Sequence, residues 1–261
     1  SSILEIDKVI RKKQSVIQVI QEKRNNSSKE IGKLISEGKD ISELKKNISN
    51  FKSELTTLEQ EIKKISNDLN DILKVLPNSL DDDVPDGDNE NENKVIKEWG
   101  TKPKFSFDPL DHVEIGEKLN QLDFKTGVKI SGSRFVMLRG RLALLERALS
   151  AFMIDTHVKN FGFEEISPPY IVKDEAMFGT GQLPKFTEDL FCTTDKRWLI
   201  PTAEVPLTNI VRDEILDKNR LPLRFVANTP CFRSEAGAAG TDTRGMIRQH
   251  QFSKVEMVFI T

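Results

Sequence analysis

The chain has 261 residues, of which 37% are hydrophobic and 31% are charged, so it is long enough for one large domain with an appendage. A formal net charge of −2 gives no global basic surface, so any surface that binds nucleic acid must be local. The two cysteines and three histidines show no metal-ligand spacing, which argues against a zinc site and favours a reducing compartment. No apolar run approaches the roughly 20 residues that cross a bilayer, and the first residues lack a signal peptide's apolar stretch. We therefore expect a cytoplasmic protein with no membrane partner.

The first 76 residues carry the apolar pattern of two packed helices. The seam of the second helix is Ile41, Leu44, Ile48, Phe51, Leu55, Leu58, Ile62, Ile65, Leu69, Ile72 and Leu76, with intervals of three and four until the last step. This spacing predicts a coiled coil of about five heptads. Upstream, Ile3, Ile6, Ile10, Ile17, Ile20, Ile31 and Leu34 fit the same template. Polar residues Lys13, Arg24 and Ser27 take seam positions there, so we expect looser packing of the first helix.

A turn separates the two predicted helices. Gly38 suits the left-handed position after a helix, and Asp40 with Glu43 three residues later resembles a capping box. The pattern predicts an antiparallel hairpin whose arms of about 35 residues project on the order of 50 Å.

Two uses of such a hairpin remain open on pattern alone. One is dimerisation or spacing, and the other is contact with a phosphate backbone. Basic side chains near the tip outnumber acidic ones; they are Lys23, Arg24, Lys29, Lys33, Lys39, Lys45, Lys46 and Lys52. This excess favours a salt-sensitive nucleic-acid contact.

An acidic segment follows the hairpin. Pro77 is expected to end the second helix, and residues 81–93 are rich in Asp, Glu and Asn with almost no apolar side chain, which is typical of a solvated linker. The segment lacks the ordered twelve-residue ligand pattern of a calcium loop. We expect a coiled-coil arm over 1–76, a linker over 77–101 and a globular domain over 102–261.

The globular part alternates helical and strand-like patterns. Helical spacing covers 111–122, and a strongly apolar stretch predicts a long helix over 135–159. Gly162 then indicates a turn, followed by a short strand and a break at Pro168 and Pro169. We expect an α+β domain built on an antiparallel sheet flanked by helices.

Residues 229–256 concentrate the chemistry. Arg233, Arg244 and Arg248 can bind phosphate or carboxylate oxygens, Phe252 can stack on a base, and Glu256 can receive an ammonium group. No Walker-type glycine-rich loop is present, so the chain is not a P-loop enzyme. Taken singly, these charges are better explained as pairing with one another on a solvated hairpin, which is the usual outcome for charge runs. The joint pattern favours a site for a nucleotide and an amino-bearing ligand.

The segments Phe232-Arg-Ser-Glu and Gly245-Met-Ile-Arg-Gln-His-Gln-Phe-Ser-Lys-Val-Glu resemble motif 2 of class II aminoacyl-tRNA synthetases, in the form found in seryl-tRNA synthetases. Phe178-Gly-Thr-Gly-Gln-Leu-Pro-Lys-Phe and Leu199-Ile-Pro-Thr-Ala-Glu-Val-Pro-Leu-Thr-Asn also match signatures of that family. Residues 132–169 are similar to motif 1, which builds the dimer interface in class II enzymes. The N-terminal hairpin is similar to the family's tRNA-binding arm.

The resemblance implies an ATP site formed by Arg233, Ser234, Glu235, Arg248, Gln249 and Phe252. Arg233 would hold the α-phosphate and the serine carboxylate, and Arg248 would bind the γ-phosphate. Phe252 would stack under adenine, Glu235 would contact the adenine amino group or neighbouring nucleotide atoms, and the backbone near Gln249 would contact the base edge.

The same resemblance implies a serine pocket lined by Thr202, Ala203 and Glu204, with Glu256 binding the substrate ammonium and Arg233 its carboxylate. The implied reaction is activation of L-serine with ATP and Mg²⁺, followed by transfer to tRNA(Ser), in a homodimer. Arg233 and Arg248 would be the catalytic residues, and no residue of this chain is expected to hold a metal. Attack on the α-phosphorus concentrates negative charge, which preorganised arginines and Mg²⁺ stabilise without a protein general base.

Two departures from the family pattern bear on this reading. Thr241 stands where the family usually has a basic residue, for which we expect a small loss of contact to phosphate or the tRNA acceptor end. The motif 3 arginine and the metal-binding carboxylate of the family are not found before Thr261, so we expect a fragment of a longer enzyme. Two other classes stay open: a synthetase-like paralogue that binds tRNA or a partner without catalysis, and a structural coiled-coil protein with an unrelated domain.

Overall fold

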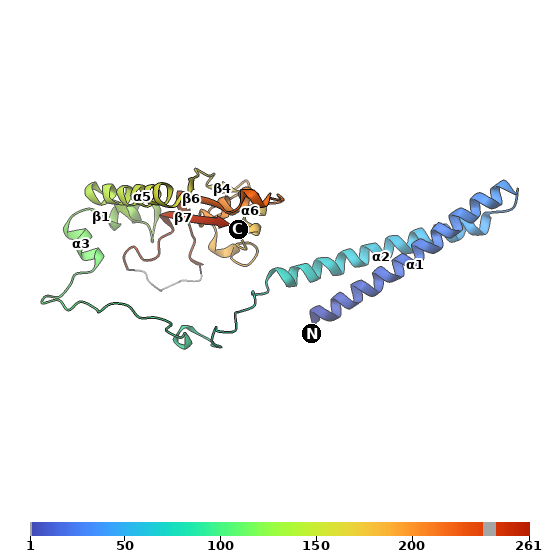
Figure 1. Cartoon of the computed structure of the whole chain (residues 1–261), viewed down its shortest axis with the longest axis horizontal. Coiled ribbons are helices and arrows are strands. Elements are labelled where there is room, and N and C mark those ends of the chain that lie inside the picture. Colours follow the sequence, from blue (N-terminus) through green and yellow to red (C-terminus); the bar gives the residue numbers. More distant parts are fainter. Residues whose placement is uncertain (1, 237–243) are drawn as a thin grey trace. The chain divides into compact units, whose positions relative to one another are not determined.

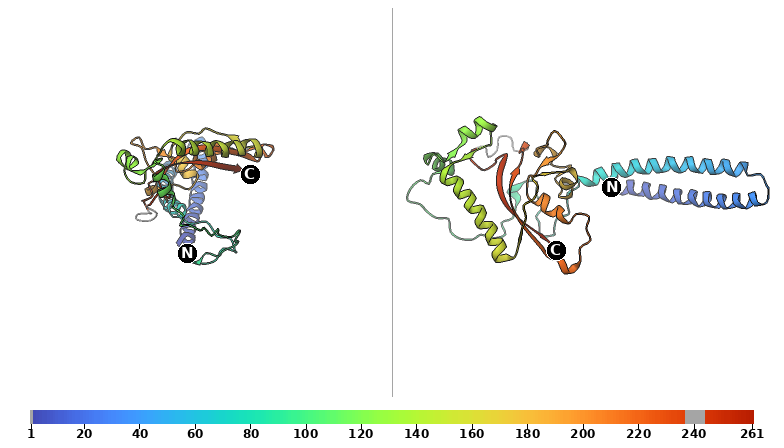
Figure 2. Two further views of the ribbon diagram at one scale, coloured as in Figure 1. Left: turned by 90° about the vertical axis from the view of Figure 1, so that its left-hand side faces the viewer. Right: turned by 90° about the horizontal axis from the view of Figure 1, so that it is seen from above.

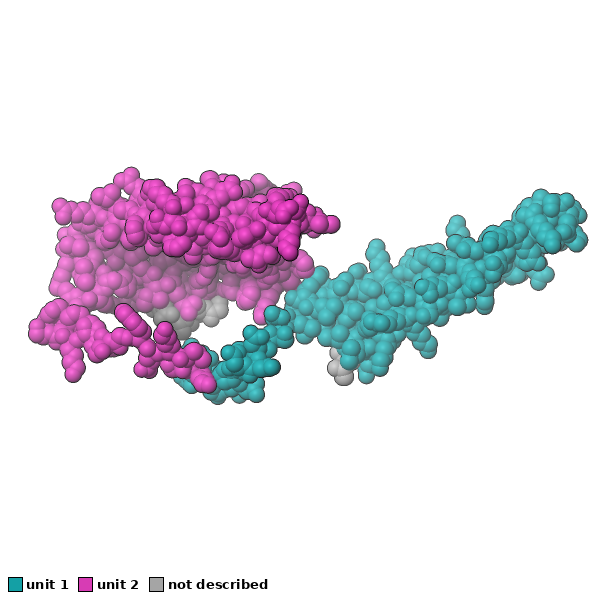
Figure 3. Space-filling view, in the orientation of Figure 1, with its two compact units in different colours: residues 1–93 teal, residues 94–261 magenta. Residues whose placement is uncertain are grey.

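The computed structural model describes residues 2–236 and 244–261, which divide into two compact units, residues 1–93 and 94–261 (Figure 3). The helices are α1 Ser2–Ser36, α2 Ser42–Lys74, α3 His112–Lys118, α4 Phe124–Ser131, α5 Gly140–Phe161, α6 Asp174–Gly179 and α7 Glu204–Thr208. The strands are β1 Leu122–Asp123, β2 Met137–Leu138, β3 Glu164–Glu165, β4 Ile171–Val172, β5 Trp198–Leu199, β6 Leu223–Phe232 and β7 Gln251–Ile260. Short 3₁₀ helices cover Glu90–Glu92, Thr187–Asp189, Asn209–Val211 and Lys218–Arg220. No helix in these described ranges is both long and apolar enough to cross a membrane.

The first unit is an antiparallel hairpin of α1 and α2 (Figures 1 and 2). Each predicted seam residue up to Ile72 is buried or half-buried, and Ile10, Ile20 and Leu55 are at most 7% exposed. The polar seam residue Lys13 on α1 forms an ion pair of 2.6 Å with Glu61 on α2. The predicted coiled-coil packing is therefore confirmed, and the polar seam position has a partner across the hairpin.

The turn between the helices confirms one prediction and corrects another. Gly38 has a φ of 68°, and the Lys39 backbone N–H donates to the Leu34 carbonyl at 3.0 Å, as in a Schellman motif. The predicted capping box is wrong because α2 begins at Ser42, which places Asp40 one residue before the N-cap. Asp40 instead accepts from the side chain and backbone N–H of Ser42, and these hydrogen bonds lower the pKa of its carboxyl. At the other end, α2 ends at Lys74, before Pro77.

Truncation of Leu55 is expected to loosen the hairpin. Leu55 is 4% exposed in the seam, so Leu55→Ala should cost about 2–5 kcal/mol of local stability. Leu73→Ala, at a side chain that is 45% exposed on the same helix, should cost much less. Native-state hydrogen exchange of the α1 amides measures both effects, and equal losses would contradict the seam packing.

The second unit is organised around a three-stranded sheet in the order β3-β6-β7. β6 and β7 pair antiparallel along their full lengths, from Leu223 opposite Ile260 to Phe232 opposite Gln251. The two-residue strand β3 runs parallel to β6. Helix α5 lies along this sheet (Figure 2). These features confirm the predicted α+β fold with an antiparallel sheet flanked by helices.

Each face of the sheet has its own apolar core. On the α5 side, the cluster consists of Ile154, Phe163 and Val226, with Val158 and Val255 packed against it. On the α7 side, it consists of Ala203, Leu207, Phe225, Ala227 and Val258. A third cluster joins β4, α6 and α7 through Val172, Met177, Leu190, Ile200 and Val205. The sheet is thus held between α5 and the α7 segment.

Two predicted helices are shorter than expected. The long helix begins at Gly140 rather than at residue 135, because Met137 and Leu138 form β2 and pair with β1. The helix predicted over 111–122 is confined to α3, whose capping box is closed by Asp111 and Glu114. The turn predicted after α5 is confirmed, since Gly162 caps the helix with a φ of 67°. The predicted boundaries of the arm, linker and globular domain at 76 and 101 stay predictions.

Candidate active site on the β6–β7 hairpin

The β6–β7 hairpin places predicted ligand-binding residues on one face of the sheet. Successive side chains of a strand point to opposite faces, so Phe252, Lys254 and Glu256 share a face with the core residue Val258. This is the side that α7 covers. Thr202 approaches the same face from the segment that leads into α7.

A polar cluster joins Thr202 to β7. The Thr202 side chain is 5% exposed, and its hydroxyl donates to Glu256 Oε2 at 2.8 Å. Lys254 Nζ donates to Thr202 Oγ1 at 2.7 Å and forms an ion pair with Glu256. The backbone N–H of Glu204 donates to Thr202 Oγ1 at 3.2 Å. One hydroxyl thus links an ammonium, a carboxylate and the start of α7.

The other two residues of the predicted serine pocket differ in their surroundings. Ala203 is fully buried in the core on the α7 side. Glu204 is exposed at the first position of α7. The structure therefore brings Thr202 and Glu256 into direct contact, whereas it leaves the Glu204 side chain at the surface.

Arg233 lies between this cluster and the aromatic ring. Its Nε donates to the Pro201 carbonyl at 3.3 Å, and its guanidinium carbon lies 5.2 Å from the centroid of the Phe252 ring. Its backbone N–H donates to the His250 carbonyl at 3.0 Å, which extends the β6–β7 ladder by one step. Arg233 is thus held close to both the predicted serine residues and the predicted adenine platform.

Glu235 and Arg248 pair across the loop that joins the strands. Their Oε2 and Nη1 atoms are 3.2 Å apart, and the Glu235 side chain is 15% exposed. Glu235 has a φ of 51°, and the 187–189 segment holds the residues on either side of it. The Ser234 and Ala236 backbone N–H groups donate to the Asp189 carbonyl and carboxylate, at 2.9 and 3.0 Å. Residues 237–243, including Thr241, lie outside the described residues.

The returning end of the loop is fixed against α3. Arg244 donates twice to Asp111 Oδ2, at 3.0 and 2.8 Å, and Met246 N–H donates to His112 Nε2 at 3.0 Å. Two hydrogen bonds lower the pKa of the Asp111 carboxyl. The larger effect comes from the backbone N–H of Glu114, and the next from the Arg244 side chain. Gly245, with a φ of 80°, has no room for a side chain, because a Cβ would lie 2.1 Å from His112 Nε2.

Gln249 connects this end of the loop to the sheet. It is 7% exposed, and its amide donates to the Gly245 carbonyl at 2.9 Å. Its Oε1 is buried without a hydrogen-bond partner among the described residues. A buried acceptor of this kind can receive a hydrogen bond from a ligand.

The sequence reasoning missed Lys254, His112 and Asp189. Lys254 could have been found from strand alternation, because it stands between Phe252 and Glu256 at a spacing of two. His112 and Asp189 are more than 40 residues from the loop in sequence, and no local pattern signals their contacts. The two cysteines are free, and burial raises the pKa of the Cys231 thiol.

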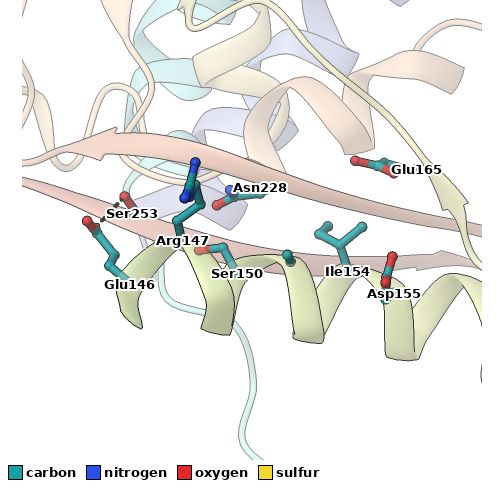
Figure 4. A pocket seen from close by; sticks show the side chains of 9 residues that line it. Glu146, Arg147, Ser150, Ile154, Asp155, Glu165, Asn228 and Ser253 are labelled. Atoms are coloured by element: carbon teal, nitrogen blue, oxygen red, sulfur yellow. Dashed lines mark hydrogen bonds between the residues drawn. The ribbon is translucent and has the colours of Figure 1, made fainter. Parts of the chain in front are cut away.

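A pocket of about 420 Å³ lies on the α5 side of the sheet (Figure 4). Its lining includes Glu146, Arg147 and Ser150 of α5, together with Asn228 of β6 and Ser253 of β7. The Ser253 hydroxyl donates to the Glu146 carboxylate at 2.9 Å. None of the predicted ATP or serine residues lines this pocket, whereas Gln249 and Phe252 line a larger one of about 890 Å³ together with residues of α3, α4 and α5.

Two family models match the chain. Residues 1–80 match the seryl-tRNA synthetase N-terminal domain, and residues 191–261 match the tRNA synthetase class II core domain (G, H, P, S and T). Curated relatives named serine–tRNA ligase, from Sinorhizobium medicae and Brucella canis, are each 52% identical over 100% of this chain. The chain spans 62% of the length of these relatives.

Solved structures agree with the sequence matches. A crystal structure of seryl-tRNA synthetase from Pyrococcus horikoshii, complexed with ATP, is similar with a TM-score of 0.90 and 34% identity, over 98% of this chain and 62% of that one. A cytoplasmic serine–tRNA ligase from Naegleria fowleri, in complex with AMP, has a TM-score of 0.82 and 29% identity, over 100% of this chain and 59% of that one. From the coiled hairpin to the end of β7, the chain belongs to the seryl-tRNA synthetase family.

Proposed function

We propose that the protein activates L-serine with ATP to form seryl-adenylate and transfers the seryl group to tRNA(Ser). The observation that supports the proposal is the contact of Thr202 with Glu256, together with the hydrogen bond of Arg233 to the carbonyl of the preceding residue, Pro201. Glu256 would bind the substrate ammonium, and Arg233 would bind its carboxylate. An α-amino acid carries the two complementary groups, an ammonium and a carboxylate, on the same carbon atom. The names of the relatives and the ATP complex of the Pyrococcus horikoshii structure support the same assignment.

Adenylate formation needs two anions to approach each other. The serine carboxylate attacks the α-phosphorus in line, a P–O bond forms, and the bond to the pyrophosphate oxygen breaks. Arg233, with its planar fork of donors, would bind both the carboxylate and the α-phosphate. Arg248 would bind the γ-phosphate end as pyrophosphate leaves, and Phe252 would hold the adenine ring by stacking. The chemistry rests on positioning and charge stabilisation, and no proton transfer by a side chain is assigned.

Glu235, Ser234 and Gln249 complete the proposed nucleotide site. The Asp189 contacts fix the backbone around Glu235, and the Arg244 and Met246 contacts to α3 fix the backbone before Gln249. Both ends of the loop are therefore anchored to other parts of the second unit. Such anchoring lowers the entropy cost of ordering the nucleotide-binding groups.

Mg²⁺ belongs to the proposed reaction as the ion that would accompany ATP. No group of three or more Asp, Glu, His or Cys side chains that could hold a metal occurs among residues 2–236 and 244–261. Glu235, a residue of the proposed nucleotide site, is paired with Arg248. We therefore derive no step through a metal from these residues.

Two interaction surfaces follow from the proposal. The α1–α2 hairpin, with its basic tip, would bind the tRNA by shape and backbone. A second copy of the chain would pack on the motif 1 region, where α5 carries exposed apolar residues; these include Leu144, Leu145, Leu149 and Phe152, each 46–68% exposed. An exposed apolar helix face of this kind favours a protein interface. A cytoplasmic location stays a prediction.

The alternative proposal is a non-catalytic paralogue that binds tRNA or another partner. The intact set of Arg233, Glu235, Arg248 and Phe252 favours the enzyme. Serine-dependent ATP–pyrophosphate exchange separates the two, since a paralogue without catalysis would bind tRNA and show no exchange.

The role of Glu256 gives a direct test of the serine pocket. In a version of the chain extended to the length of its relatives, Glu256→Gln should raise the KM for serine by roughly 10- to 100-fold, because a charged hydrogen bond to the ammonium is lost. The KM for ATP should change little. Glu165→Gln, an exposed residue on the α5-side pocket, is the matched control and should leave both constants unchanged. An unaltered serine KM in Glu256→Gln would remove Glu256 from the pocket.

A further inference from the structure

The Lys254 ammonium contacts Glu256, which is proposed to receive the substrate ammonium, and the hydroxyl of Thr202 beside it. Its Nζ lies 2.7 Å from Thr202 Oγ1 and forms an ion pair with Glu256 Oε2. These two oxygens are themselves hydrogen-bonded at 2.8 Å, so they form one small acceptor site. Lys254 was given no role by the sequence pattern or by the proposed reaction.

Lys254 occupies hydrogen-bond positions on both oxygens. Thr202 is 5% exposed, and the Glu256 and Lys254 side chains are 23% and 31% exposed, so the pair lies in a partly desolvated region. A substrate ammonium and the lysine ammonium are chemically equivalent donors with the same charge. Two such cations at hydrogen-bond distance from the same carboxylate oxygen repel each other. A substrate ammonium would therefore compete with Lys254 for Thr202 Oγ1 and Glu256 Oε2.

The lysine can leave without a change in the fold. Its flexible four-carbon stem allows the ammonium to move while β7 stays paired with β6, where Lys254 stands opposite Thr229. The exchange replaces one ammonium on Glu256 by another, so the carboxylate keeps a partner throughout. The backbone positions of Arg233 and Phe252 do not depend on it.

We propose that Lys254 is a positioning residue that competes internally for the substrate-ammonium site and thereby sets the affinity for serine. The proposal rests on the proposed function of the Thr202–Glu256 pocket. When Lys254 is bound to the two oxygens, the pocket is closed to an amino acid, and the apparent affinity is the intrinsic affinity multiplied by the fraction of molecules with the oxygens open. The lysine also keeps the Glu256 carboxylate oriented until serine arrives.

Lys254→Met in the extended chain tests this competition, because methionine removes the charge and retains an unbranched side chain. If the oxygens are open in about 10–30% of molecules, the KM for serine should fall by roughly three- to tenfold. The KM for ATP and the kcat of ATP–pyrophosphate exchange should stay within about twofold, since a purely structural defect would move them together with the serine KM. Lys254→Arg keeps a competing cation, and its serine KM should not fall.

Each other outcome overturns the proposal. A higher serine KM or a large loss of kcat in Lys254→Met would show that the ammonium binds the substrate or the transition state. An unchanged serine KM would show that Lys254 does not compete. Thermal unfolding checks that Lys254→Met folds. If Lys254→Met does not fold, Lys254→Gln replaces it, with the same expected changes in the serine KM, the ATP KM and kcat. Serine-dependent exchange by the unsubstituted extended chain tests the proposed function itself. A failure of the proposed function is therefore distinguishable from a failure of the Lys254 proposal.

Discussion

Arg233→Ala is expected to abolish serine-dependent ATP–pyrophosphate exchange, with a loss in kcat/KM of about 10³-fold or more. Arg233 lies next to both Pro201 and the Phe252 ring, between the proposed serine and adenine sites. Its guanidinium is the group proposed to neutralise the serine carboxylate and the α-phosphate as they approach. Without the Arg233 guanidinium, the serine carboxylate and the α-phosphate would approach each other with no positive charge to offset their repulsion. Steady-state exchange, in the chain extended to the length of its relatives, measures the effect.

Two controls make the Arg233 result specific. Arg197→Ala removes an exposed arginine that is paired with Asp195, and it should leave exchange unchanged. Arg233→Lys keeps the charge but loses the planar fork, so it should retain only part of the activity. Because Arg233 also binds the Pro201 carbonyl, the thermal unfolding of each variant must be compared. Exchange within about tenfold of the unsubstituted chain in Arg233→Ala would contradict the assigned role.

Deletion of residues 1–76 is expected to abolish tRNA binding while leaving amino-acid activation intact. The hairpin belongs to the first compact unit, whereas all the proposed ATP and serine residues belong to the second. Binding of tRNA(Ser), measured by filter retention, should weaken by about 10²-fold or more, because the phosphate contacts of the arm are lost. The kcat for serine-dependent exchange should stay within about threefold. Unchanged tRNA binding by the deleted chain would contradict the role of the arm.

Point substitutions can locate the tRNA contact on the hairpin. Replacing the exposed lysines Lys29, Lys33, Lys45 and Lys46 near the tip by Gln should weaken tRNA binding and reduce the slope of log K against log salt. Lys63→Gln with Lys64→Gln, at exposed positions farther along α2 from the turn, is the matched control and should have little effect. The comparison separates contact at the tip from general attraction along the rod.

The hairpin could be predicted in detail because its information is local. Seam residues from Ile3 to Ile72 recur at the helical period, and each of them is buried or half-buried. Gly38 takes the left-handed conformation that its position suggested. The capping box at Asp40 was wrong by one residue, since the N-cap is Ile41 and Asp40 accepts from the N–H of Ser42, the first residue of α2. Helix ends depend on such single hydrogen bonds, which a periodic pattern does not specify.

The start of α5 shows a different limit. Apolar residues 135–138 fit a helix as well as a strand by pattern, and the choice is made by pairing between Met137–Leu138 and Leu122–Asp123. Gly140 then begins the helix with a φ of 54°. The strand partner lies 15 residues upstream, outside the window in which periodicity is judged.

The residues of the candidate site also fall into those that local sequence could suggest and those that only tertiary packing brings together. The motif residues from Arg233 to Glu256 could be chosen from the sequence because the β6–β7 hairpin brings them together through local pairing. The contacts of Ser234 with Asp189, and of Met246 with His112, join segments that are 45 and 134 residues apart. Such contacts depend on tertiary packing, so the sequence could name the proposed ligand-binding residues but not the residues that hold them in place.

The central claim is tested most directly by ATP–pyrophosphate exchange with a panel of amino acids, using the chain extended to the length of its relatives. The proposed function, which for the choice of serine rests on the family relationship, predicts exchange that depends on serine and is much weaker with threonine or alanine. Stimulation by another amino acid would contradict the serine assignment. No exchange with any amino acid, in a protein that still binds tRNA(Ser), would contradict catalysis and favour the non-catalytic paralogue.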